Sequence, residues 1–328
     1  MKYFLTGATG FVGSWVAKQL VDKDEEVACL VRKTSNLRWL KDLPVEYHYG
    51  SLNDPESLKA GIKTADYVLH IGGVTKALTI DEFYKGNVEA TRNILDVVMA
   101  VNPGLKKFVY VSSQAAAGPS PPNPGKAMDE TAAMQPLTDY GTSKLQGEEV
   151  VLAFMPDLPI TILRPPTVYG PRDTDVFEVF KNVKNRVNLK IGSHDPVVSI
   201  IHVYDLARGI IHAAEHPKSN GEVYFIANKK PCVWSEVIDI LQALMDRKVV
   251  NIPVPYPVAY GFGGVVEFFS KLNGKPSILN RQKMREVNAG YWVISSQKIK
   301  EQLDFSCEIS LRDGFKNSLE WYQNEGWL

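Results

Sequence analysis

The chain has 328 residues, in which 37 lysines and arginines balance 37 aspartates and glutamates. This balance argues against a nucleic-acid-binding protein, because such proteins carry a net positive field. The three cysteines are widely spaced and form no CxxC pair, which is typical of a protein in a reducing compartment. The sequence shows no signal peptide and no apolar run of the roughly 18 residues that span a membrane. These features predict a soluble cytoplasmic protein. A chain of this length suits two domains, or one large domain with a cap.

The first half of the chain alternates segments with strand and helix patterns. The run KYFL at the start is typical of a short buried strand, and FVGSWVAKQLVDK has the apolar period of a helix. Further strands are predicted at Glu26–Val31, Val45–Tyr49, Tyr67–Ile71, Lys107–Val111 and Ile160–Leu163, with helical segments at Glu56–Ile62, Asp81–Val101 and Asp139–Phe154. Strands separated by helices predict an α/β fold, a Rossmann-type doubly wound parallel sheet with a smaller mixed C-terminal region.

The alternation loosens after residue 165. A loop-like segment is predicted up to Gly192, followed by a strand over Val197–His202 and a helix from Val203. Later helices are predicted in VWSEVIDILQALM and in the C-terminal LRDGFKNSLEWYQNEGWL. Between them, NIPVPYPV contains three prolines that exclude a regular helix, namely Pro253, Pro255 and Pro257.

The stretch TGATGFVG, residues 6–13, joins the first predicted strand to the first predicted helix. Gly7 would allow a tight turn, Gly10 a close approach of a ligand and Gly13 close packing of the helix on the strand. Because the N–H groups of a helix N-terminus bind phosphate, the stretch predicts a dinucleotide pyrophosphate site; a plain structural turn is the alternative. The same loop contributes Thr9, Phe11 and Val12.

The second predicted strand ends where an NAD-binding chain carries an acidic residue for the ribose 2′-hydroxyl, about 20 residues after the glycines. In this chain the segment reads Arg32, Lys33, Thr34 and Ser35, with no carboxylate. Two cations and two hydroxyls suit a 2′-phosphate, so NADP(H) is favoured as the cofactor and Arg32, Lys33 and Ser35 as its ligands. NAD(H) is the alternative, with Arg32 and Lys33 as ordinary solvated charges.

The segment YGTSK places Lys144 four residues after Tyr140, on the same face of a predicted helix. An ammonium beside a phenol stabilises the phenolate and lowers the pKa of the tyrosine, which suits it to transfer protons near neutral pH. A predicted strand that ends in Ser112–Ser113 lies upstream. Tyr140, Lys144 and the serines at the end of this strand therefore predict an acid–base site.

Four ordered motifs, TGATGFVG, YVSSQAAAG, YGTSK and RPPTVYGP, resemble the extended short-chain dehydrogenase/reductase superfamily over nearly the whole chain. The resemblance implies that Ser113, five residues before Gly118, is the catalytic serine and that Tyr140 is the general acid/base. It implies that Lys144 binds the nicotinamide ribose and lowers the tyrosine pKa. Asn87 matches a family asparagine, although a structural, helix-bending role fits it equally well.

The resemblance also assigns further ligands of the cofactor. Ile71, Gly72 and Gly73 form a small-residue segment beside it, and Pro165 and Val168 pass the nicotinamide amide. Where the family often has an aspartate beside adenine, this chain has Ser51–Leu52, so Leu52 and main-chain groups are expected there. Substrate contacts are expected from Val74, Gln114, Tyr169 and Arg172. No metal site is expected, because no histidines have short ligand spacing.

The resemblance is strongest to a branch that holds 3β-hydroxysteroid dehydrogenases, dihydroflavonol-type reductases and bacterial keto-lipid reductases. It implies NADP(H)-dependent interconversion of a ketone and a secondary alcohol on a large, mostly apolar substrate. Val198 supports this expectation, because nucleotide-sugar members typically carry an arginine there. A nucleotide-sugar epimerase or dehydratase with bound NAD is one alternative, and a non-catalytic NADP(H)-binding scaffold is another.

Domain roles and partners follow. Residues 1–165, with a returning segment 197–228, are assigned to cofactor binding, and residues 166–196 and 229–328 to substrate binding. The aromatic stretch VAYGFGGVVEFFSKLNGK and the basic residues after it, within 258–285, predict an interfacial membrane helix, a buried pocket wall or a dimer contact. The resemblance implies a homodimer formed through the two helical segments Asp81–Val101 and Asp139–Phe154.

Overall fold

The computed structural model describes residues 1–122, 126–277 and 279–328. Its largest element is a seven-stranded parallel sheet with the strand order β11-β6-β5-β4-β1-β2-β3. The strands are β1 (Lys2–Thr6), β2 (Glu26–Val31), β3 (Glu46–Tyr49), β4 (Tyr67–His70), β5 (Lys107–Val111), β6 (Ile160–Arg164) and β11 (Glu222–Phe225). The strands predicted in the first half of the chain are confirmed to within one residue at each end.

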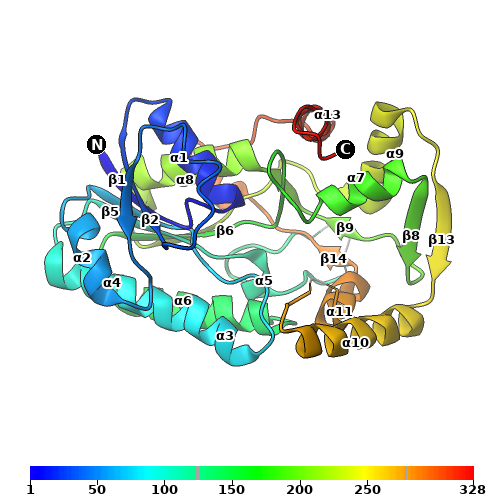
Figure 1. Cartoon of the computed structure of the whole chain (residues 1–328), viewed down its shortest axis with the longest axis horizontal. Coiled ribbons are helices and arrows are strands. Elements are labelled where there is room, and N and C mark those ends of the chain that lie inside the picture. The colour runs from blue at the N-terminus through cyan, green and yellow to red at the C-terminus, as the bar shows by residue number, and fades with distance from the viewer. Residues whose placement is uncertain (123–125, 278) are drawn as a thin grey trace.

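Helices cover both faces of the sheet (Figure 1). One face packs against α1 (Phe11–Val21) and α8 (Val203–Glu215), and the other packs against α2 (Pro55–Lys63), α4 (Ala90–Val101) and α6 (Asp139–Phe154). Because both faces are covered, the strands β1, β4, β5 and β6 are buried at every position except Lys2 and Tyr67. Their sequences are therefore largely continuous apolar runs.

The strand order reverses between β1 and β4, which pair although β2 and β3 separate them in the chain. The loops that follow these two strands leave the carboxyl edge of the sheet toward opposite faces, so a crevice opens there. The predicted α/β fold with a Rossmann-type parallel sheet is confirmed. We call the sheet and its covering helices the sheet region.

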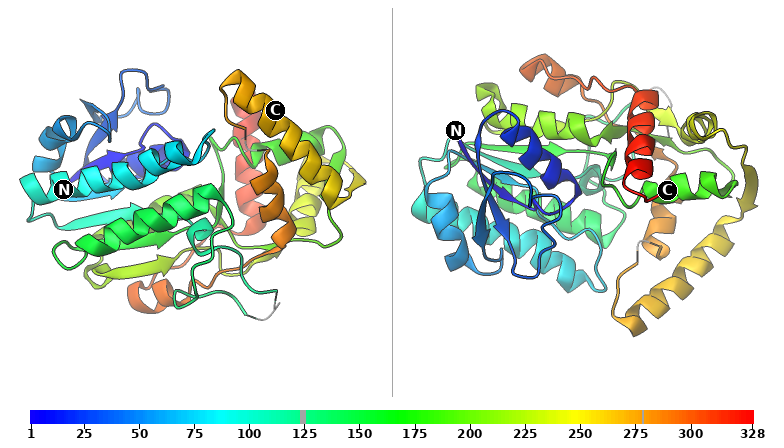
Figure 2. Two further views of the ribbon diagram at one scale, coloured as in Figure 1. Left: turned by 90° about the horizontal axis from the view of Figure 1, so that it is seen from below. Right: turned by 45° about the horizontal axis from the view of Figure 1, so that its top comes forward.

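A second, smaller body, which we call the distal region, packs around its own aromatic core of Tyr169, Phe180, Phe315 and Tyr322 (Figures 1 and 2). Its helices are α7 (Phe177–Lys184), α9 (Trp234–Met245), α10 (Tyr256–Asn273), α11 (Arg281–Ala289) and α13 (Leu311–Asn324). Two of its sheets are strand pairs, β7 (Thr167–Tyr169) with β10 (Ile200–His202) and β8 (Val187–Ile191) with β13 (Val250–Val254). A third sheet has three strands in the order β12 (Cys232–Val233), β9 (Val197–Val198) and β14 (Tyr291–Trp292).

The remaining helical segments are short and pack on the sheet region. They are α3 (Ile80–Tyr84), a π-helical turn (Lys85–Glu89), α5 (Gln114–Ala117), a 3-10 turn (Pro217–Ser219) and α12 (Gln297–Leu303). The predicted helical segment Asp81–Val101 is therefore α3, the π-helical turn and α4 in succession. Helix α12 lies on the sheet region, because Ile299 and Leu303 belong to its core.

The structure differs from the prediction in three places of the second half. The loop-like segment up to Gly192 contains β7, α7 and β8; α7 has only eight residues, too few to show a helical period. The predicted strand Val197–His202 is interrupted at Ser199, whose N–H donates to Trp292 O and whose Oγ accepts from Ile294 N, so its two halves pair with different sheets.

The third difference concerns the prolines of NIPVPYPV. Pro253 lies in β13, an edge strand in which a missing N–H is tolerated. Pro257 lies in the first turn of α10, where the proline N has no partner to lose. The prediction that these prolines exclude a regular helix is therefore wrong at Pro257. Helices α9 and α13 are confirmed.

Candidate active site

A cleft of about 2360 Å³ opens at the carboxyl edge of the sheet, between the sheet region and the distal region. The sheet region lines it with the glycine loop and with the residues that follow β4, β5 and β6. The distal region lines it with α7, α9, α10 and α11. This is the position at which α/β sheets bind their ligands.

The glycine loop has the geometry that its sequence predicts. Gly7 has a φ of +75°, and a Cβ there would lie 2.6 Å from Gly72 N. A Cβ on Gly13 would collide with the backbone of Gly7, so only glycine lets α1 approach the strand this closely. Gly10 is the N-cap of α1 and offers no side-chain acceptor, so the first N–H groups of the helix are available to a ligand in the cleft.

A series of buried hydrogen bonds supports this loop from below the cleft surface. Thr6 Oγ1 lies 2.7 Å from His70 Nδ1 and accepts from Gly72 N, and His70 Nε2 lies 3.1 Å from Thr91 Oγ1. Burial lowers the pKa of His70 to about 3, so the ring is neutral. Thr91 Oγ1 donates to Asn87 O, which assigns the imidazole proton to Nε2. His70 is therefore a structural histidine.

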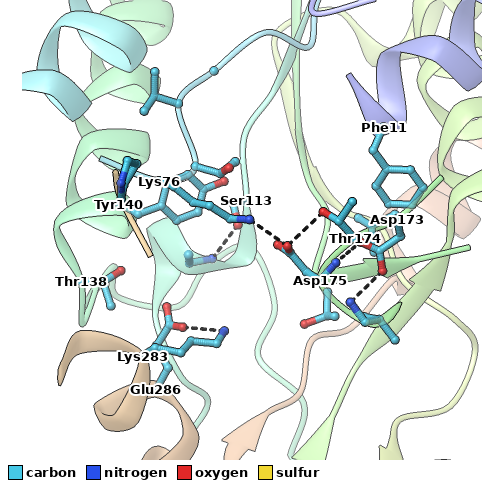
Figure 3. Close-up of a pocket in the computed structure, with 18 of the residues that line it drawn as sticks. Phe11, Lys76, Ser113, Thr138, Tyr140, Asp173, Thr174, Asp175, Lys283 and Glu286 are labelled. Atoms are coloured by element: carbon cyan, nitrogen blue, oxygen red, sulfur yellow. Dashed lines mark hydrogen bonds and ion pairs between the residues drawn. The ribbon is translucent and has the colours of Figure 1, made fainter. Parts of the chain in front are cut away.

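Ser113 and Tyr140 lie beside each other on one wall of the cleft (Figure 3). Ser113 is the N-cap of α5, and its Oγ accepts from Ala115 N at 3.1 Å. Tyr140 lies in the first turn of α6, whose N-cap is Thr138, and Lys144 lies one turn later. The three predicted acid–base residues are therefore brought together at one end of the cleft.

Lys144 is buried, and its Nζ donates to Val111 O at 2.8 Å and lies 4.3 Å from the centre of the Tyr110 ring. Burial lowers the pKa of Lys144 to about 7, and Glu148 opposes this shift. Burial also raises the pKa of Tyr140 to about 12, although its hydrogen bond with Ser113 acts in the opposite direction. The expected lowering of the phenol pKa is thus absent from this state of the protein, because desolvation of the phenolate dominates.

Asn87 lies in the π-helical turn and is buried. Its Oδ1 accepts from Val74 N at 2.7 Å, and its Nδ2 donates to Val74 O and to Ser143 Oγ, each at 2.9 Å. The amide therefore ties the loop after β4 to α6, next to Lys144. In this structure Asn87 positions its neighbours and is not itself part of the cleft lining.

Most of the other residues expected at the cofactor line the cleft. They are Thr9, Phe11, Val12, Arg32, Ser35, Ser51, Leu52, Ile71, Gly72, Gly73, Pro165 and Val168. Arg32 is exposed at the end of β2, and its N–H donates to Ser35 Oγ at 3.0 Å. Lys33 is exposed but lies outside the lining, because it follows Arg32 on the solvent side of this turn.

The four expected substrate contacts divide evenly. Val74 and Gln114 line the cleft, whereas Tyr169 and Arg172 do not. Tyr169 is buried in the distal core, stacked on Phe315 with ring centres 4.5 Å apart. Arg172 has a φ of +76°, which turns the chain, and its guanidinium lies 3.9 Å from the Trp15 ring. These two side chains support the packing behind the cleft.

The structure adds residues that the sequence did not indicate. Lys76 and Asp175 form an ion pair of 2.9 Å across the cleft (Figure 3). Asp173 is buried in the opposite wall, where its carboxylate accepts from the N–H groups of Asp175 and Val176, and burial raises its pKa to about 6. Thr138 also lines the cleft, and of these residues it alone could have been found from the sequence. A threonine directly before a segment with helical periodicity is a typical helix N-cap.

Residues 3–227 match the family described as the NAD dependent epimerase/dehydratase family. The chain is similar to the ceramide reductase of Caulobacter vibrioides, with 29% identity over 324 residues that cover 99% of this chain and 95% of that protein. It is 27% identical over 332 residues to the UDP-glucose 4-epimerase of Vibrio cholerae, covering 96% and 94% of the two chains.

A solved structure of UDP-glucuronic acid 4-epimerase from Bacillus cereus in complex with NAD has the same fold, with a TM-score of 0.79 and 20% identity over 99% of each chain. The glycine loop and the cleft described above lie within the matched residues, apart from the cleft wall contributed by α9, α10, α11 and β14. The chain therefore belongs to the NAD-dependent epimerase/dehydratase family and is an NAD(P)-dependent oxidoreductase.

Proposed function

We propose that the protein is an NADP(H)-dependent reductase that interconverts a ketone and a secondary alcohol on a large, mostly apolar substrate. The observation that carries this proposal is the placement of Ser113 and Tyr140 side by side in the cleft, with Lys144 buried behind them. A non-catalytic cofactor-binding scaffold would not need these three groups in one place.

Residues at both ends of the expected cofactor site fit the cofactor. The glycine loop leaves a space that a Cβ would fill, and the first turn of α1, which has no side-chain cap, offers its N–H groups there. We propose that Lys144 binds the nicotinamide ribose and that Arg32 and Ser35 bind the 2′-phosphate of NADP(H). NAD(H) is the alternative, since a solved neighbour of the same fold is an NAD complex.

In the reductive direction, Ser113 Oγ and the Tyr140 hydroxyl donate hydrogen bonds to the ketone oxygen. The carbonyl carbon would receive the hydride that reduced nicotinamide, when bound, would supply. Tyr140 then transfers its proton to the oxygen, which completes the secondary alcohol. A phenol whose pKa is about 12 is protonated at neutral pH, so Tyr140 is ready to donate before the reaction begins.

The charges of the cleft favour an uncharged substrate. Beyond the cofactor end, the lining holds the carboxylates Asp139, Asp173, Asp175, Glu178, Asp195, Asp239, Glu267 and Glu286 against Lys76, Lys190, Lys271 and Lys283. Three of these lysines are already paired, with Asp175, Glu267 and Glu286 respectively. A diphosphate would therefore be bound among excess carboxylates, at a high desolvation cost.

Apolar side chains complete the same part of the cleft. Val74, Phe83, Val176, Trp234, Ile238 and Trp292 line it. Val198 also lines it, at the position expected to hold an arginine in nucleotide-sugar enzymes. The relative named ceramide reductase supports a lipid-like ketone, whereas the relative named UDP-glucose 4-epimerase keeps the nucleotide-sugar reaction as the second candidate.

The test follows NADPH oxidation by absorbance with two substrate panels: long-chain keto-lipids, steroid ketones and flavonoid ketones on one side, and UDP- and TDP-sugars on the other. We expect turnover with a member of the first panel only. Tyr140→Phe is the matched control, and we expect it to lose turnover by about 10²–10⁴-fold while it retains NADPH binding. Turnover of a nucleotide sugar with no activity on the apolar ketones would contradict the proposal.

A further inference from the structure

Helix α10 carries a row of large apolar side chains on its outer face. Val258, Phe262, Val265, Phe269 and Leu272 recur at intervals of three or four residues, and Phe268 lies beside them, so all six share one face. Their exposed fractions lie between 53% and 66%. The alternative that this stretch is a buried pocket wall is therefore wrong for these six side chains.

The opposite face of α10 is fixed against α11. A Cβ on Gly264 would meet the guanidinium of Arg281, and a Cβ on Gly263 would lie 3.0 Å from the Asn280 backbone, so the two segments are in close contact there. Arg285 Nη2 donates to Tyr260 Oη at 3.3 Å. The helix is thus held with its apolar face exposed. It lies at the edge of the molecule (Figure 2).

The segment that carries this face is basic. Residues 256–289 hold five cations, Lys271, Lys275, Arg281, Lys283 and Arg285, against Glu267 and Glu286, although the whole chain is balanced. All five cations are exposed. Among the described residues, Lys271 pairs with Glu267 and Lys283 with Glu286. The surplus positive charge therefore resides on Lys275, Arg281 and Arg285.

We propose that α10 is an interfacial helix that docks the protein on an anionic lipid bilayer, with its apolar face in the acyl boundary and the basic residues at the phosphates. An exposed apolar face on a segment rich in lysine and arginine is typical of helices that lie in a membrane surface. No helix of the described residues is long and apolar enough to cross a membrane, so the contact is peripheral.

A second copy of the chain fits this face less well. A symmetric contact through α10 would bring two copies of the same basic segment together, and like charges at an interface oppose association. An anionic lipid surface instead complements the surplus positive charge of Lys275, Arg281 and Arg285. The proposed docking does not depend on the proposed reaction, but it determines which wall of the cleft lies next to the lipid.

Helices α10 and α11 also line the cleft, through Glu267, Ser270 and Lys271 of the first and Gln282, Lys283 and Glu286 of the second. The same two helices therefore separate the apolar face from the cleft. Docking would therefore place one wall of the cleft next to the lipid.

The test is flotation of the full-length protein with vesicles of phosphatidylcholine alone and with vesicles that also contain phosphatidylglycerol. We expect the protein to float with the anionic vesicles and to remain below with the neutral ones. Phe262→Ser with Phe269→Ser should reduce flotation by about tenfold or more, and Arg281→Gln with Arg285→Gln should reduce the preference for the anionic vesicles.

Tyr49→Ser and Val250→Ser are the matched controls, because both side chains are as exposed as those of α10 but lie on β3 and β13. Both should float like the unmodified protein. Failure of the unmodified protein to float with anionic vesicles would overturn the proposal, as would equal flotation of the α10 variants. A change from dimer to monomer in the α10 variants, without flotation of the unmodified protein, would assign the face to a second copy instead.

Discussion

Lys76 and Asp175 form an ion pair of 2.9 Å, although 99 residues separate them in the chain. Lys76 belongs to the loop after β4 and Asp175 to the segment after β7, so the pair joins the sheet region to the distal region across the cleft (Figure 3). The two side chains are 34% and 52% exposed. Solvent therefore screens the pair, and its main effect is on the width of the cleft.

Lys76→Met is expected to change the free energy of unfolding by less than ~1 kcal/mol, as for other exposed ion pairs. We expect the KM of a large ketone to rise severalfold, because the loop after β4 is no longer held, while the Kd of NADPH is unchanged. Lys59→Met is the control, since Lys59 forms a similarly exposed pair with Glu56 far from the cleft. An equal effect of the two substitutions on KM would contradict this role.

The buried ammonium of Lys144 makes stability depend on pH. Its pKa is about 7 in the folded protein against an ordinary value of 10.5, so between these values the unfolded chain binds more protons than the folded one. The contribution of Lys144 to the free energy of unfolding therefore rises as pH rises through this window and is lost as pH falls toward 7. Urea unfolding of the unmodified protein and of Lys144→Met at several pH values measures it. The difference between the two curves should grow with pH, and a constant difference would exclude the effect.

Arg32→Asp is expected to weaken NADPH binding by about ten- to a hundredfold, because a charge-assisted contact to phosphate is replaced by repulsion. NADH binding should change much less. Lys33→Asp makes the same change of charge one residue further on, outside the cleft lining, and should have a smaller effect on either cofactor. Fluorescence titration of each variant with both cofactors gives the four dissociation constants. Equal losses for NADPH and NADH in Arg32→Asp would assign the cofactor to NAD(H).

Gly13→Ala is expected to lower the free energy of unfolding by ~1–3 kcal/mol and to weaken NADPH binding, because the new methyl group forces α1 away from the Gly7 backbone. Gly104→Ala is the control. A Cβ on Gly104 meets no atom within 4 Å, so this variant should unfold like the unmodified protein. Thermal unfolding with and without NADPH separates the two effects, and a Gly13→Ala protein with normal stability would show that the close contact is unimportant.

The parts of the site that the sequence predicts are those specified over a short length of chain. The turn at Gly7–Gly13 is continuous, and Tyr140 and Lys144 are four residues apart on one helix. The sheet was predictable because both of its faces are covered, which makes each central strand a continuous apolar run.

The remaining features depend on contacts between distant segments. Nothing local to Lys76 indicates Asp175. Arg172 adopts a positive φ, and this conformation orients its side chain. A positive φ is uncommon in residues other than glycine and could not be predicted from the sequence here. The pKa of Tyr140 depends on how deeply the phenol is buried, which its spacing to Lys144 does not reveal.

Helix α12 limits how proteins of this architecture can be recombined. Ile299, Leu303 and Phe305 pack in the same core as Leu5 and Val109, and Tyr224 donates to Gln302 from the outermost strand. A fragment that ended after β11 would leave this side of the sheet uncovered and its apolar side chains in water. A chimera that exchanges the cleft wall of one relative for that of another must therefore exchange an internal segment and retain residues 297–307 of the parent sheet.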